Sequence, residues 1–259
     1  MTRIGILGCG GRMGKMLVTE VQQHPGAVLS GGAARQGSAL IGQKLGAMPV
    51  TDKADELFVA SEAVIDFTRP ELLKAHLDLA VRYGKALVIG TTGLDAEARA
   101  AIKEAAKSVP LVQAANMSVG VTLLGQLVKQ LAAKLDDATF DIEIVEMHHR
   151  HKIDAPSGTA LALAEAAAQG RDVQLADVAR KSRDGQIGAR PQGEIGISTL
   201  RGGDVVGDHT VIFAAEGERI EISHKASSRQ IFARGAVRAA LWAAGRKPGL
   251  YSMLDVLGL

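Results

Sequence analysis

Short apolar runs alternate with segments of helical pattern in the first half of the chain. Buried strands are predicted at residues 4–7, 27–33, 63–67, 86–89 and 111–114. Helices are predicted at residues 70–83 and 95–108, and after the first strand, where Met13, Met16, Leu17 and Val21 share one face. Strands and helices that alternate at this interval are typical of βαβ units, so the pattern predicts a parallel sheet.

The pattern changes after Asn116. Helices are predicted at residues 119–135, 157–169 and 230–244, and a half-buried strand at 140–147, where apolar and polar residues alternate. Residues 182–193 are rich in Gly and Arg and indicate a loop. Residues 195–222 are typical of antiparallel strands, joined by turns at 202–204 and 216–218.

We therefore predict two domains. Residues 1–118 and 229–259 are expected to form a Rossmann-type α/β dinucleotide-binding domain, onto which the last helix packs back. Residues 119–228 are expected to form an α+β substrate domain with a mainly antiparallel open sheet. The chain of 259 residues is long enough for two modest cores.

Charge and composition narrow the function classes. The 30 Lys and Arg residues nearly balance the 28 Asp and Glu residues, which argues against a dedicated nucleic-acid binder. The single cysteine, Cys9, fits a reducing compartment. No apolar run approaches the ~20 residues that cross a bilayer, and the first residues do not resemble a secretion signal. We expect a cytoplasmic protein with neither a nucleic-acid nor a membrane partner.

The segment Gly8-Cys9-Gly10-Gly11-Arg12-Met13-Gly14 follows the first strand and opens the first helix, as a dinucleotide-binding turn does. Gly8 permits a tight turn, Gly11 lets backbone N–H groups approach a pyrophosphate, and Gly14 allows close helix–sheet packing. Arg12 can add charge-assisted hydrogen bonds. The spacing differs from the commoner Gly-x-Gly-x-x-Gly, so a turn that only connects strand and helix is the alternative.

The end of the second strand bears on the choice of cofactor. An acid there binds the ribose 2′-hydroxyl of NAD, whereas an Arg accommodates the 2′-phosphate of NADP. The chain has Ala33-Ala34-Arg35-Gln36, so Arg35 is suited to the 2′-phosphate, although a solvated surface Arg is the alternative. Residues 66–68, 90–92 and 115–117 also follow parallel strands, whose carboxyl ends line the binding crevice. We expect NADPH, with NADH as a second possibility.

The densest chemical cluster runs from Glu146 to Ala160. Five consecutive basic side chains at 148–152 precede a helix start marked by Pro156, Ser157, Gly158 and Thr159. A helix N-terminus beside a basic cluster is suited to a substrate that carries carboxylates. A metal site is disfavoured, because no two His lie one helical turn apart with a nearby acid. A basic surface loop is the other alternative.

Segment 146–160 resembles the signature of the 4-hydroxy-tetrahydrodipicolinate (dihydrodipicolinate) reductase family. The resemblance extends along the chain through motifs at 8–14, 66–70, 90–93, 114–120 and 224–229. It implies reduction of 4-hydroxy-tetrahydrodipicolinate to tetrahydrodipicolinate with NADH or NADPH and release of water, on the route to diaminopimelate and lysine. It also implies a homotetramer in which the substrate domains form the central contact.

The resemblance also implies residue roles. His148 matches the proton donor/acceptor, Lys152 the proton donor and His149 a substrate-binding position, while Gly158 and Thr159 match the pocket for a substrate carboxylate. The nicotinamide contacts match Gly90, Thr91, Thr92, Ala114, Ala115, Asn116 and Met117. Ala34 replaces an acid that contacts the adenosine ribose in many members, whereas the NADP-associated Arg is present as Arg35.

Two other classes of function stay open at this point. One is another two-domain nicotinamide-dependent dehydrogenase, although Cys9 is badly placed for a covalent thiol intermediate. The other is a redox-sensing dinucleotide-binding module without turnover, which would not need the His-Lys cluster. The sequence leaves open which of His148 and Lys152 delivers the last proton.

Overall fold

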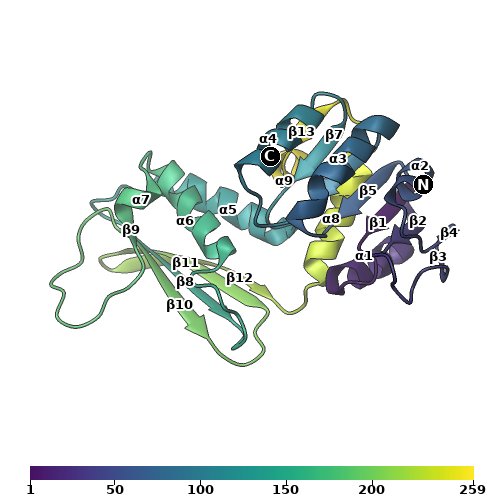
Figure 1. Cartoon of the computed structure of the whole chain (residues 1–259). Helices are drawn as coiled ribbons and strands as arrows, with labels where there is room; N and C mark the ends of the chain where they lie inside the picture. Colours follow the sequence, from purple (N-terminus) through teal and green to yellow (C-terminus); the bar gives the residue numbers. More distant parts are fainter. The chain divides into compact units, whose positions relative to one another are not determined.

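The computed structural model describes all residues from 1 to 259 and divides the chain into two units. Unit 1 comprises Met1–Val119 and Gln230–Leu259, and unit 2 comprises Gly120–Arg229. Figure 1 shows the elements of each unit. No helix is both long enough and apolar enough to cross a membrane.

Unit 1 contains the predicted parallel sheet. Its strands are β1 (Thr2–Leu7), β2 (Ala27–Ala33), β5 (Ala63–Asp66), β6 (Ala86–Ile89), β7 (Pro110–Gln113) and β13 (Gly249–Tyr251). They follow the order β13-β7-β6-β5-β1-β2, and every neighbouring pair is parallel. The chain passes from β2 at one edge to β5 on the far side of β1, so the order reverses between β1 and β5. Ligands of open α/β sheets bind at the carboxyl ends of the strands beside such a reversal.

Helices cover both faces of this sheet (Figure 1). One face carries α1 (Arg12–Gln23), α8 (Gln230–Ala243) and α9 (Met253–Leu257), and the other carries α2 (Ala54–Ala60), α3 (Pro70–Tyr83) and α4 (Ala96–Ala105). A sheet buried on both faces explains the continuous apolar runs of the sequence. Gly84 ends α3 in the left-handed conformation, with φ of 62°, which glycine adopts without strain. A short hairpin, β3 (Lys44–Leu45) and β4 (Met48–Pro49), follows β2.

Unit 2 contains a mixed sheet rather than the mainly antiparallel sheet expected. Its strands are β8 (Asp141–His148), β9 (Ala179–Arg180), β10 (Ile195–Arg201), β11 (Gly207–Ala215) and β12 (Glu218–Ala226), in the order β12-β11-β8-β10-β9. The pairs β12/β11 and β11/β8 are antiparallel, whereas β8/β10 and β10/β9 are parallel. The predicted hairpin at 202–204 is wrong, because the chain there passes β8 and places β11 on its other side. The turn at 216–218 does join β11 to β12.

Helices cover one face of the unit 2 sheet. They are α5 (Val119–Ala132), α6 (Gly158–Gly170) and the short α7 (Leu175–Val178). Apolar side chains of α5 and α6, including Leu124, Val128 and Leu163, pack on Ile142, Ile144, Val211 and Phe213 of the sheet. Residues 182–193 form the predicted loop. Arg183 and Arg190 of this loop bind the carboxylate of Glu143.

Candidate active site

The turn after β1 has the geometry expected of the glycine segment. Gly8 has φ of 68°, which glycine adopts without strain. A Cβ on Gly14 would lie 2.1 Å from the carbonyl oxygen of Gly8, so α1 packs on the turn only with glycine there. The N-cap residue Gly11 provides no side-chain hydrogen bond to the first turn of α1. The N-terminal amides of α1 therefore lack a side-chain cap, which suits an anion.

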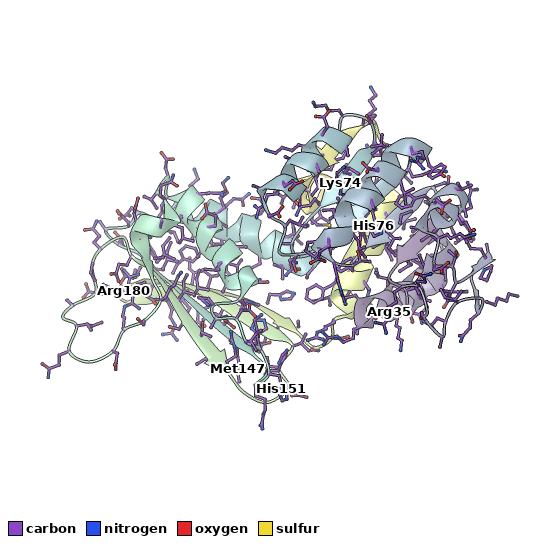
Figure 2. All side chains as sticks on the ribbon, viewed as in Figure 1. Arg35, Lys74, His76, Met147, His151 and Arg180 are labelled. Atoms are coloured by element: carbon purple, nitrogen blue, oxygen red, sulfur yellow. The ribbon has the colours of Figure 1, made fainter.

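The loop after β5 lies beside this turn. The Thr68 Cγ2 atom is 3.1 Å from the position that a Gly8 Cβ would take. The buried Asp66 fixes the loop, because its Oδ1 accepts hydrogen bonds from the N–H and the hydroxyl of Thr68 at 2.8 and 2.6 Å. Its Oδ2 is 2.7 Å from Nδ1 of His76 on α3, a residue labelled in Figure 2.

The edge of the unit 1 sheet at which these strands have their carboxyl ends also carries an unsatisfied polar atom. The Thr91 hydroxyl, just after β6, is buried and has no hydrogen-bond partner within the chain. Buried polar groups of this kind normally have a partner. Together with the side-chain-uncapped start of α1 and the reversal between β1 and β5, this hydroxyl fits a bound dinucleotide.

The expected cofactor residues differ in what they expose. Arg12 and Arg35, the second of which is labelled in Figure 2, are exposed and form none of the ion pairs of the chain, so both cations are available to phosphate groups. The side chains of Cys9 and Met117 lie in the hydrophobic core, so only their main-chain atoms can reach a ligand. The space beside Gly90 is taken by the ring of Phe67, which would lie 2.3 Å from an added Cβ.

The remaining expected contacts follow the strands. Gly10, Gly11 and Met13 belong to the turn and to the first turn of α1. Thr92 follows β6, and Ala114, Ala115 and Asn116 follow β7. The side-chain oxygen of Asn116 accepts a hydrogen bond from the N–H of Ser118 at 2.9 Å, which shapes the chain ahead of α5.

Strand β8 brings the polar residues of unit 2 together. Its buried side chains are, in chain order, Ile142, Ile144, Glu146 and His148. The buried face of the strand is therefore apolar at its start and polar at its end. The neighbouring strands also carry polar side chains at this end, because His209 of β11 lies opposite Glu146, and Arg201 of β10 lies opposite His148. In Figure 2, Met147 and His151 mark this end of the sheet, and Arg180 marks the other end.

The buried Glu146 carboxylate is the centre of the polar cluster. Its Oε2 lies 2.6 Å from Nδ1 of His148 and accepts a hydrogen bond from Arg201 at 2.8 Å. Its Oε1 accepts hydrogen bonds from Arg201 and from the N–H of Ser157, both at 2.9 Å. Burial raises the pKa of this carboxyl, but the bonds from Arg201, His148 and Ser157 together hold it below its ordinary value.

His209 packs against this centre. Its ring meets the ring of His148 edge to face, with 5.2 Å between centroids. Its Nε2 is 3.1 Å from the hydroxyl of Ser157, which also accepts the N–H of Ala160 as the N-cap of α6. Burial and the neighbouring His148 lower the pKa of His209 to about 4, so the imidazole is neutral at neutral pH.

The loop between β8 and α6 carries the other expected residues. The Lys152 ammonium binds both carboxylate oxygens of Asp154 at 2.8 Å. His149 Nε2 lies 3.4 Å from a guanidinium nitrogen of Arg229, and partial burial and the charge of Arg229 lower the pKa of His149. A Cβ on Gly158, at the start of α6 beside Thr159, would meet no atom within 4 Å.

Sequence reasoning gave no role to Glu146, Arg201, His209 or Arg229. Glu146 and His209 were detectable, because each places a polar side chain at a buried position of an alternating strand. Arg201 had no such signal, since its proximity depends on β10 pairing in parallel with β8. His148, His149, Lys152, Gly158 and Thr159 all lie at this end of unit 2. No group of three or more His, Cys, Asp or Glu side chains is arranged to hold a metal ion.

The chain is similar to known proteins over nearly its whole length. Models of the dihydrodipicolinate reductase N-terminus and C-terminus match residues 2–117 and 120–257. A curated 4-hydroxy-tetrahydrodipicolinate reductase of Pseudomonas fluorescens is 52% identical over 268 residues and is covered, like this chain, to 100%. Its counterpart of Rhizobium rhizogenes is 50% identical over 265 residues, which is 99% of this chain and 97% of the relative.

A solved structure agrees as well. The dipicolinate-bound dihydrodipicolinate reductase of Paenisporosarcina sp. TG-14 has a TM-score of 0.80 and 25% sequence identity, and the match covers 98% of each chain. The chain belongs to the dihydrodipicolinate reductase family.

Proposed function

We propose that the chain reduces 4-hydroxy-tetrahydrodipicolinate to tetrahydrodipicolinate with NADPH or NADH, on the route to diaminopimelate and lysine. The observation that carries the proposal is the polar end of unit 2. There the Glu146 carboxylate binds both His148 and the N–H of Ser157 at the start of α6, and Lys152 lies in the loop between β8 and α6. It occurs in a chain about half identical to curated reductases of that name over nearly full length. Dipicolinate, bound in the solved relative, is a dicarboxylate, as the proposed substrate is.

The reaction adds one hydride and one proton to the substrate, and its hydroxyl group leaves as water. The glycine turn of unit 1 with Arg12 would hold the pyrophosphate of the cofactor, whose nicotinamide would supply the hydride. The amides of Gly158 and Thr159 at the start of α6 hold one substrate carboxylate. Lys152 donates a proton once the substrate competes with Asp154 for its ammonium, and His148 exchanges protons through its imidazole. His149 completes the substrate contacts.

The activity is tested by oxidation of NADPH and NADH in the presence of substrate freshly made from pyruvate and aspartate semialdehyde. Turnover supports the proposal. If neither NADPH nor NADH supports turnover, the proposal is contradicted. Retained binding of NADPH would then favour a sensing module.

Lys152→Ala tests the role in proton transfer. General acid catalysis contributes ~10²–10⁴-fold, so kcat should fall within this range. A change in KM alone would assign Lys152 to substrate binding instead. The control is Lys134→Ala, because the side chain of Lys134 is exposed and takes no part in the polar cluster. Gln230→Ala would be unsuitable, because the side chain of Gln230 donates a hydrogen bond to Glu20 in unit 1.

The proposal extends to a homotetramer in the cytoplasm. The face of the unit 2 sheet opposite α5 and α6 carries half-buried and exposed apolar side chains, among them Val145, Met147 and Leu200. Contact between such faces would make unit 2 the tetramerisation domain and leave unit 1 to the dinucleotide. Fractionation of cells tests the location, and the assembly is tested below.

A further inference from the structure

We propose that Glu146 and Gly207 are positioning residues that determine which nitrogen of His148 exchanges the proton. Glu146 holds Nδ1, and Gly207 leaves Nε2 accessible. The inference rests on the proposed function, because it takes His148 as the group that exchanges protons with substrate. The geometry on which it depends is a property of unit 2 alone.

The contacts of Glu146 determine the direction of its bond to His148. Three hydrogen bonds come to its carboxylate from donors that cannot accept: two from the Arg201 guanidinium and one from the N–H of Ser157. They stabilise the ionised carboxylate, which has only lone pairs to offer to His148. The bond of 2.6 Å therefore requires a proton on Nδ1. The neutral ring is then the Nδ1–H tautomer, and its basic nitrogen is Nε2.

Arg201 and Ser157 also hold Glu146 in place. Arg201 donates to the carbonyl oxygens of Asp154 and Leu200, at 2.7 and 2.6 Å, as well as to Glu146. Ser157 is the N-cap of α6. One carboxylate thus joins β8, β10 and the start of the helix proposed to bind substrate. A carboxylate buried without these partners would instead take up a proton.

Gly207 lies at the opposite edge of the His148 ring. A Cβ at this position would lie 2.9 Å from Nε2 of His148, closer than real Cβ atoms approach a neighbouring atom. Gly207 does not have a positive φ, so its backbone conformation does not require glycine. Glycine at this position instead leaves room for the His148 ring, because a methyl group here would displace His148 or cover Nε2.

The arrangement assigns a separate task to each edge of the ring. When Nε2 gives up its proton, the proton on Nδ1 stays there and remains hydrogen-bonded to the Glu146 carboxylate. The ring then becomes the neutral Nδ1–H tautomer without turning. Arg201 lies opposite His148 on the neighbouring strand β10, and the ring of the neutral His209 packs edge to face on the His148 ring. Neither replaces Glu146 at Nδ1.

The first test is the tautomer of His148 in Glu146→Gln, read from ¹⁵N chemical shifts of histidine-labelled protein. We expect a dominant Nδ1–H tautomer in the wild type and its loss in the variant. The matched control is Glu143→Gln, because Glu143 lies on the same strand and also binds arginine side chains, yet at the other face. It should leave the His148 signals unchanged. An unchanged tautomer in Glu146→Gln would overturn the proposal whether or not the enzyme turns over.

The second test is a double-mutant cycle. If Glu146 acts through His148, Glu146→Gln should lower kcat by about 10²-fold or more, with a smaller change in KM. The variant Glu146→Gln/His148→Gln should then lose no more than His148→Gln alone. Additive losses would show that Glu146 acts elsewhere. Lack of wild-type turnover would contradict the proposed function but leave the tautomer result valid.

Gly207→Ala keeps the proposal testable if Glu146→Gln fails to fold. We expect a fall in kcat of at least about tenfold, with shifted His148 signals and unchanged NADPH binding. Gly202→Ala is the control, because this glycine lies in the connection that leads from β10 to Gly207, the first residue of β11, and its added Cβ would meet only the flexible end of Met147, at 3.2 Å. Equal kcat values for wild type and Gly207→Ala would overturn the role of Gly207.

Discussion

His209 is kept neutral by burial among the polar residues of unit 2. Its pKa of about 4 in the folded chain lies below the ordinary 6.5, which we take for the unfolded chain. As pH falls below 6.5 the unfolded chain takes up a proton at this residue, while the folded chain does not. The free energy of unfolding should therefore fall between about pH 6.5 and 4, by up to about 3 kcal/mol from this group. Below pH 4 this loss is complete.

Urea unfolding followed by circular dichroism at pH 7, 6, 5 and 4 measures this effect. In His209→Gln the decline over this pH range should be smaller than in the wild type. The exposed His151→Gln is the control and should keep the wild-type decline. Parallel pH curves for wild type and His209→Gln would show that His209 does not remain neutral.

Arg35 should discriminate between the two nicotinamide cofactors. It is exposed after β2, with no acid paired to it and Ala34 beside it. A hydrogen bond to a charged group contributes about 1.5–3 kcal/mol, so Arg35→Ala should raise the KM for NADPH by about 10–100-fold and barely change that for NADH. Arg12→Ala should weaken both, since the pyrophosphate is common to them. Equal losses for both cofactors in Arg35→Ala would exclude a 2′-phosphate contact.

At the scale of elements, the start of α6 should be sensitive to a single methyl group. Nothing lies within 4 Å of a Cβ added to Gly158, so Gly158→Ala should fold normally and fill space in front of the helix amides. We expect KM for the substrate to rise about tenfold and the melting temperature to change little. Steady-state kinetics and calorimetry give these two values.

Gly125→Ala is the matched control for this substitution. Gly125 lies within α5, and its added Cβ also meets nothing within 4 Å. Alanine there should stabilise the helix by about 0.5–1 kcal/mol and leave KM unchanged. If both variants behaved alike, the start of α6 would have no part in substrate binding.

The predictability of the elements follows from how local their signals are. The strands of unit 1 are short apolar runs bounded by turns, and α3 has Pro70 at its start and Gly84 at its end, so sequence locates them well. The hairpin β3/β4, α2, α7, β9, β13 and α9 are too short for a periodic pattern and were not predicted. The order of strands in unit 2 depends on pairing at a distance, which alternation along one strand does not encode.

The site is predictable to the same extent. The glycine turn and the segment 146–160 are contiguous, so their residue types and spacing were visible in the sequence. The partners of Glu146 come from 55 and 11 residues away, at Arg201 and Ser157. The sequence therefore indicated which residues do chemistry, but the residues that orient them required the fold.

At the scale of the whole molecule, the assembly should depend on the open face of the unit 2 sheet. Leu200 is 49% exposed on β10, beside Met147 of β8, and α5 and α6 cover only the opposite face. Leu200→Lys would bury an unpaired charge in a tetramer centred on this face, so the mass from light scattering after size exclusion should fall to that of smaller species. Leu72→Lys, at a similarly exposed leucine of α3 in unit 1, should keep the wild-type mass. A wild-type mass for Leu200→Lys would place the contact elsewhere, and a monomeric wild type would contradict the tetramer itself.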